Sequence, residues 1–269
     1  MLLRACAAAR AWNGSVFARR PASSPHEWRS THPDLLLYEY EASPWCRRVR
    51  ETLCVLDLEH TVLPCPRETL RLEGAFGSAS RHKPAVVEAG GRLLFPFLHD
   101  RTADVALNGS AEIVAHLWEH YGQDAERPPL DCLLNGGLPK PLDFASLVAP
   151  SALRPWPECG LFVTPSRAAA LPLVLHGCEP EPGTRLLREK LCTLQLAYRY
   201  KPRAMELGAV IPHLEDPNTG FGSFGARDGL AYLSETYQAG TALDLFAPVP
   251  SPNLGDPGRK SWISTFLRP

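Results

Sequence analysis

The feature that most constrains this chain is an internal repeat. Residues 49–58 (VRETLCVLDL) reappear as residues 187–196 (LREKLCTLQL), at an offset of 138 positions. Further along, blocks within residues 95–121 reappear within 211–237, at an offset of 116. Because the two offsets differ by 22 positions, the second copy is shortened between its two blocks. Repeated order and spacing of this kind predict two similar units within the 269 residues.

The first copy predicts the element order βαβαββα. Residues 35–40 form an apolar run of strand length, and Ser43-Pro44 provides an N-cap followed by proline in the first turn of a helix. The other expected elements are a helix at 44–57, strands at 61–63, 95–99 and 105–107, a short helix at 83–88, and a last helix capped by Ser110.

This order resembles the thioredoxin-like fold of the N-terminal domain of glutathione S-transferases and of glutaredoxins, over residues 35–122. Three short motifs carry the resemblance: Ser43-Pro44-Trp45-Cys46, where glutaredoxins have Cys-Pro-aromatic-Cys; Phe95-Pro96, where the family has a cis-proline; and Gly109-Ser110, where transferases have Glu-Ser or Gln-Ser. The tandem arrangement resembles plastid proteins of plants and algae that carry two such domains. The predicted fold class is therefore α/β, with two thioredoxin-like copies, the second truncated.

The resemblance implies a glutathione site in the first copy. Phe95 and Pro96 would hold the tripeptide backbone, and Gly109 with Ser110 would hold the γ-glutamyl end, because a helix N-terminus favours a carboxylate. Ser43 and Cys46 are the candidate catalytic residues, at the helix start where they would meet the sulfur. A serine hydroxyl does not ionise near pH 7, so Ser43 would stabilise a thiolate rather than attack a disulfide.

The second copy lacks these residues. Glu181 stands at the position of Ser43, and Gly225-Ala226 replaces Gly109-Ser110, so this copy is predicted to be structural. After residue 122 we expect no counterpart of the all-helical domain that shapes the electrophile pocket of transferases. Two functions stay open: a glutathione-binding, transferase-like or thiol-redox protein, and a non-catalytic tandem adaptor or scaffold that contacts a protein partner.

The remaining segments are predicted to lie outside the two copies. Residues 1–26 contain arginine and serine but no acidic residue, which is typical of an organellar transit peptide. The resemblance to tandem plastid proteins implies a plastid as the organelle, with the mitochondrion as the alternative. Residues 123–170 form a proline-rich linker, which leads into the degenerate second copy at 171–240 and a tail at 241–269.

Composition excludes several classes of partner. The net charge of −1 predicts no nucleic-acid partner, and no apolar run is long enough to predict a membrane span. The eight cysteines include no Cys-x-x-Cys pair, so a zinc ribbon is excluded and we predict no metal. Arg47, Arg48 and Arg50 are interpreted as a solvated helix face.

Overall fold

The computed structural model describes two halves of the chain, residues 33–122 and 159–239, with gaps at 69–79, 180 and 203–210. The predicted transit peptide and tail, and residues 123–158 of the predicted linker, lie outside the described residues. The first half contains β1 (Leu35–Glu39), α2 (Pro44–Val55), β2 (His60–Pro64), α3 (Lys83–Gly90), β3 (Phe97–Asp100), β4 (Val105–Asn108) and α4 (Ser110–Tyr121). The second half contains β5 (Leu173–Gly177), α7 (Pro182–Thr193), β6 (Tyr198–Pro202), β7 (His213–Asp216), β8 (Phe221–Phe224) and α8 (Ala226–Tyr237).

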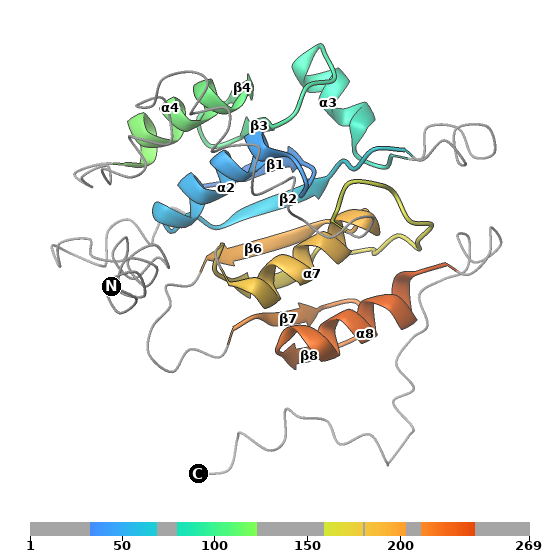
Figure 1. The fold of residues 1–269 in the computed structure, drawn as a ribbon. Coiled ribbons are helices and arrows are strands. Elements are labelled where there is room, and N and C mark those ends of the chain that lie inside the picture. Colours follow the sequence, from blue (N-terminus) through green and yellow to red (C-terminus); the bar gives the residue numbers. More distant parts are fainter. Residues whose placement is uncertain (1–32, 69–79, 123–158, 180, 203–210, 240–269) are drawn as a thin grey trace, which may run out of the picture.

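The described strands form one sheet, in the order β4-β3-β1-β2-β6-β5-β7-β8 (Figure 1). In each half the first two strands pair in parallel and the remaining pairs are antiparallel. The halves join edge to edge through antiparallel pairing of β2 with β6, where His60 lies opposite Tyr200 and Val62 opposite Tyr198. This junction pairs two strand edges that would otherwise present free backbone groups.

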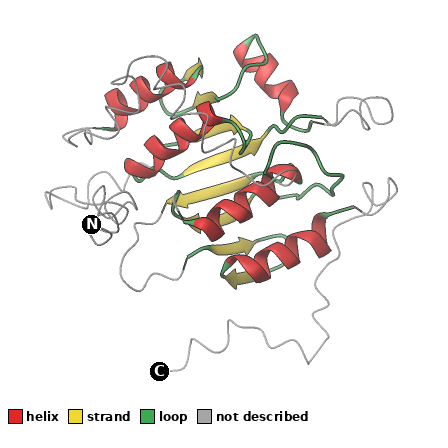
Figure 2. Cartoon of the chain, in the orientation of Figure 1, coloured by secondary structure: helices red, strands yellow, loops and turns green. Residues whose placement is uncertain are grey.

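Helices α2, α4, α7 and α8 lie in a row on one face of the sheet (Figure 2). In the first half, Leu35 and Leu37 of β1 pack against apolar residues of α2 and α4. In the second half, Leu173 and Leu175 of β5 pack against apolar residues of α7 and α8. Each half therefore builds its main core between the sheet and this helical layer.

The opposite face of the sheet differs between the halves. Successive strand residues point to opposite faces, so Leu36 and Tyr38 lie on this second face, where Val86 of α3 packs against them. The chain between β2 and β3 spans residues 65–96, whereas the chain between β6 and β7 spans only residues 203–212. The shortening indicated by the two offsets falls at this connection, and no described helix corresponds to α3 in the second half.

The helix starts largely agree with the prediction. The Ser43 hydroxyl accepts a hydrogen bond from the Cys46 amide at 3.3 Å, which caps α2. In α7 the Glu181 carboxylate plays the same part and accepts from the Gly183 amide at 2.8 Å. Helix α4 differs by one residue, because its N-cap is Gly109, with a φ of 97°, and not Ser110. A positive φ of this size favours glycine.

Part of the predicted linker is ordered against both halves. The Arg67 amide donates to the Leu161 carbonyl at 2.7 Å, and the Val163 amide donates to the Arg67 carbonyl at 2.9 Å. The Thr164 amide then donates to the Thr193 carbonyl of α7 at 2.8 Å. Residues 159–167 therefore connect the end of β2 to the second half. None of the described helices is both long and apolar enough to cross a membrane.

Candidate functional site

The start of α2 holds the two candidate catalytic side chains, and both are buried. Ser43 is 1% exposed and Cys46 is 0% exposed. Burial, together with the nearby Glu39 carboxylate, raises the pKa of the Cys46 thiol to about 12, although the Ser43 hydroxyl acts in the opposite direction. At neutral pH Cys46 is therefore a protonated thiol, which cannot attack a disulfide.

Cys46 is expected to resist alkylation in the folded protein. With a pKa of about 12 it holds on the order of 10³-fold less thiolate at pH 8 than an ordinary thiol. Iodoacetamide labelling followed by peptide mass spectrometry measures this, with the urea-unfolded chain as the reference. Complete labelling of Cys46 in the folded protein within minutes would contradict the burial.

Three segments predicted to form the glutathione site lie together. The Phe95–Pro96 peptide bond is cis, as the resemblance implied. The Gly109 amide donates to the Pro96 carbonyl at 3.1 Å, which joins the loop before β3 to the start of α4. The Phe95 ring contacts the Tyr40 ring edge-on at 6.2 Å, and the Tyr40 carbonyl accepts from the Ser43 amide at 3.0 Å. The segments around Ser43, Pro96 and Gly109 are thus connected.

The start of α4 brings in one acidic residue that the sequence analysis did not identify. No side chain caps this helix, and Glu112 lies in its first turn. A Cβ atom at Gly109 would stand 2.5 Å from Glu112 Oε2, so the absence of a side chain at Gly109 leaves room for this carboxylate. A signal was available, because an acid three residues after an N-cap commonly folds back onto a helix start.

A buried ion network was also missed by the sequence analysis. Arg50 of α2 and Arg188 of α7 have side chains that are 3% and 1% exposed, so the interpretation of Arg50 as part of a solvated face is wrong. Each arginine contacts the carboxylates of both Glu41 and Glu179, which follow β1 and β5. Glu39 adds a third carboxylate, 2.5 Å from Arg50 Nη1.

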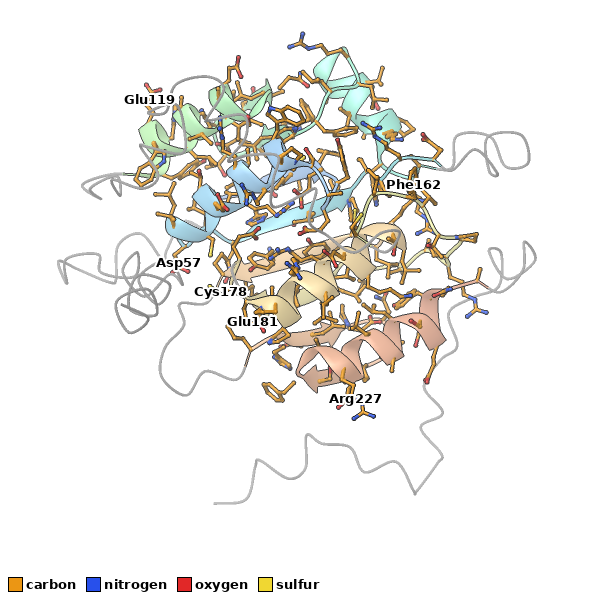
Figure 3. All side chains as sticks on the ribbon, in the orientation of Figure 1. Asp57, Glu119, Phe162, Cys178, Glu181 and Arg227 are labelled. Atoms are coloured by element: carbon orange, nitrogen blue, oxygen red, sulfur yellow. The ribbon has the colours of Figure 1, made fainter. Side chains whose placement is uncertain are left out.

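The geometry of this network is similar in the two halves. Arg50 Nε lies 3.2 Å from Glu179 Oε1, and Arg188 Nε lies 3.2 Å from Glu41 Oε2. Each guanidinium therefore reaches across the β2–β6 junction to a carboxylate of the other half. Both charges of each pair are buried, so the network links the two halves by ion pairs that are removed from water. Figure 3 shows Cys178, next to Glu179, at the same end of the molecule as Asp57.

A second pair of matching contacts anchors the last helix of each half. In the first half, Asp100 Oδ2 accepts from Tyr121 Oη at 2.6 Å and lies 2.8 Å from His116 Nε2. In the second half, the Asp216 carboxylate accepts from both Tyr232 and Tyr237. In both halves, therefore, a buried aspartate at the end of a strand holds polar side chains of the helix that follows.

Comparison with known proteins identifies the first half. The model of the glutathione S-transferase N-terminal domain matches residues 37–126. The first half carries this thioredoxin-like domain. The domain places the starts of α2 and α4 and the Phe95–Pro96 loop at one end of its sheet, which is where the three predicted motifs meet.

Similar solved structures include several glutathione transferases. A Bombyx mori enzyme is 23% identical, with a TM-score of 0.29, and the match covers 42% of this chain and 48% of that chain. A glutathione transferase homologue of Drosophila mojavensis is 24% identical, with a TM-score of 0.26, over 38% of this chain and 42% of that one. The chain thus spans about half the length of these proteins. No curated protein matches the chain.

Proposed function

We propose that the first half of this protein binds glutathione, without a reacting protein thiol. The proposal rests on one observation, the meeting of the segments around Ser43, Pro96 and Gly109 in a glutathione S-transferase N-terminal domain. The backbone of Phe95 would pair with the cysteinyl part of the tripeptide in an extended arrangement. Any chemistry would be that of the thiol of glutathione itself.

The start of α4 would hold the γ-glutamyl end of glutathione. Its first amides have no side-chain cap, so together with the Ser110 hydroxyl they can donate hydrogen bonds to the carboxylate. Gly109 stands where transferases carry an acidic or amide residue, and Glu112, beside it, would receive the γ-glutamyl ammonium group instead. Ser43 would contribute its hydroxyl proton to the glutathione sulfur, since its oxygen already accepts from the Cys46 amide.

A second function, a non-catalytic adaptor or scaffold for a protein partner, is favoured by a different observation. The Ser43 side chain is 1% exposed, and Cys46 is fully buried with a raised pKa. A ligand sulfur would need this serine to become accessible. In the scaffold hypothesis, Ser43 only caps α2 and the joined sheet presents a rigid surface.

Glutathione binding is expected to depend on Glu112 and not on its counterpart in the second half. Glu112→Gln removes the negative charge that would pair with the ammonium group but keeps an acceptor oxygen, and replacing a charge-assisted hydrogen bond of about 1.5–3 kcal/mol by a weaker neutral one weakens binding by up to roughly 10-fold. Asp228→Asn, in the first turn of α8, is the matched control and should change nothing. Calorimetric titration of the full chain with reduced glutathione measures both variants.

A second ligand distinguishes a contact between Ser43 and the glutathione sulfur from other effects of replacing this serine. S-methylglutathione has no thiolate to accept a hydrogen bond from the serine hydroxyl. Ser43→Ala should therefore weaken the binding of glutathione but leave the binding of S-methylglutathione unchanged. If wild-type protein gives no heat with either ligand, the glutathione proposal fails and the scaffold function stands.

We further propose that the second half is a reduced copy of the same domain. Its strand order, its Glu181 cap and its Asp216 anchor support this proposal. A plastid location is proposed from the composition of residues 1–26, which suits an organellar transit peptide, and from the resemblance to tandem plastid proteins.

A further inference from the structure

The second half carries three side chains that could bind a metal ion, on the sheet face opposite to α7 and α8. His176 of β5 lies opposite His213 of β7 in the strand register, and Glu215 follows two residues after His213. Residues two apart on a strand share a face, so all three side chains point to the same side. Their candidate ligand atoms lie within 4.8 Å of one another.

The distances within this cluster suit a tetrahedral ion. Glu215 Oε1 lies 3.2 Å from His176 Nε2 and 3.3 Å from His213 Nδ1. Bonds of about 2.0–2.2 Å to a tetrahedral Zn²⁺ place neighbouring ligand atoms roughly 3.3–3.5 Å apart. Two of the three separations between ligand atoms therefore already suit a tetrahedral site, and the third lies within 4.8 Å. Its side chains are 14%, 20% and 45% exposed, in the order His176, His213, Glu215, so an ion could enter from solvent.

The first half shows what this face holds when a helix covers it. There the register pair corresponding to His176 and His213 is Tyr38 opposite Phe97, and the two rings pack at 5.5 Å. Both belong to an apolar cluster under Val86 of α3. In the second half the shorter connection accompanies a change from an aromatic pair to a pair of imidazoles with a carboxylate. This change of residue type is what a metal site needs and a packed core does not.

One neighbouring residue fixes the orientation of an imidazole. The Phe224 ring stacks on the His213 ring at 4.2 Å, with an angle of 12° between the planes. The His176 and His213 rings are themselves 5.3 Å apart. Packing that orients a ligand before the ion arrives reduces the reorganisation that binding requires.

We propose that His176, His213 and Glu215 bind one Zn²⁺ ion, with water at the fourth position. Two imidazoles and one carboxylate are the donor set that suits zinc and similar transition-metal ions, whereas Mg²⁺ and Ca²⁺ prefer oxygen ligands alone. Such an ion would connect β5 and β7 on the face that α3 covers in the first half. The cysteine spacings gave no sign of this site, because its ligands are histidines and a glutamate on two strands that a helix and a third strand separate in the chain.

The test is a titration of the full chain, free of an affinity tag and stripped of metal by a chelator. Calorimetry with Zn²⁺ should give one site per chain, and Co²⁺ should give a visible spectrum without a thiolate charge-transfer band. The double variant His176→Tyr/His213→Phe recreates the residues of the first half. It should weaken Zn²⁺ binding by more than roughly 100-fold, which is the most that losing a residue behind a metal ligand usually costs.

Two further variants complete the design. Glu215→Ala changes the most exposed of the three residues and should also weaken binding, while Glu215→His, which supplies another imidazole, should retain it. His99→Ala is the matched control, because His99 occupies the corresponding position of β3 in the first half. Glu215→Ala also provides the test if the double variant does not fold. Zn²⁺ binding that is unchanged in Glu215→Ala, or a thiolate band with Co²⁺, would overturn the proposal.

Discussion

Replacing Arg188 by methionine is expected to lower the free energy of unfolding by about 3–5 kcal/mol, the usual result of leaving a buried charge without its partner. Arg188 is 1% exposed and lies 2.8 Å from the Glu179 carboxylate and 3.2 Å from that of Glu41. Without it, Arg50 alone would have to compensate three buried carboxylates. Urea unfolding monitored by circular dichroism measures the loss.

The control for this prediction is an arginine on the strand that joins the halves. Arg199 of β6 is exposed and lies opposite Thr61 in the register, so Arg199→Met should change the stability by no more than about 0.5 kcal/mol. A double variant, Arg188→Met with Glu179→Gln, should recover part of the loss because it removes one unpaired carboxylate. An Arg188→Met protein as stable as wild type would show that the network does not hold the two halves together.

The second large effect is a pH dependence that arises from two buried groups. Burial raises the pKa of Glu39 to about 7, with Arg50 opposing the shift and Glu41 adding to it. Between pH 4.5 and 7 the folded protein therefore keeps a proton that the unfolded chain releases. Because the folded state binds more protons in this range, the Glu39 contribution makes stability fall as pH rises.

His60 acts in the opposite direction. Burial lowers its pKa to about 4, while its Nδ1 hydrogen bond to the Leu58 carbonyl, at 2.9 Å, acts to raise it. Between pH 6.5 and 4 the unfolded chain takes up a proton that the folded protein excludes. The His60 contribution is thus present above pH 6.5 and is lost as pH falls toward 4. In the overlapping range the two effects largely cancel in the wild-type protein.

Single substitutions should reveal each effect. As the pH rises from 4.5 to 8, the unfolding free energy of Glu39→Gln should increase relative to that of wild type by on the order of 3 kcal/mol. This figure follows because a pKa difference of one corresponds to about 1.4 kcal/mol. The His60→Phe variant should not show the fall in stability that His60 causes between pH 6.5 and 4, because phenylalanine takes up no proton. Unfolding free energies measured across this pH range test both, and a Glu39→Gln profile parallel to that of wild type would contradict the assignment to Glu39.

Much of the fold could be predicted from the sequence, because the signals are local. Ser43-Pro44 indicated the start of α2 from an N-cap and a first-turn proline, and α2 begins at Pro44. The sequence Asp216-Pro217-Asn218-Thr219-Gly220 is a run of turn residues, and it joins β7 to β8 as a hairpin. The match of residues 37–126 to a known domain agrees with the order of elements expected there.

The candidate site was harder to predict, because its chemistry depends on burial. The sequence placed Cys46 at a helix start, where a dipole favours a thiolate. The packing around it decides the opposite, since burial and the Glu39 carboxylate raise the pKa of the thiol more than the Ser43 hydroxyl and Arg50 lower it. Glu112 had a sequence signal, an acid three residues after the N-cap, but its position beside Gly109 depends on the N-cap being Gly109, one residue before the expected cap.

By itself, the sequence determined the order of elements in the first half, and its two matching blocks predicted a shorter connection in the second half, where residues 203–212 stand against residues 65–96 of the first. Only the tertiary structure decided that Arg50 and Arg188 are buried and that His176 faces His213 and Glu215. The physical reason is that caps, turns and periodicity act over a few residues, whereas the surroundings of a charge depend on which strands pair. Here the pairing of β2 with β6 buries two helix faces, one of α2 and one of α7, that would otherwise be exposed to solvent.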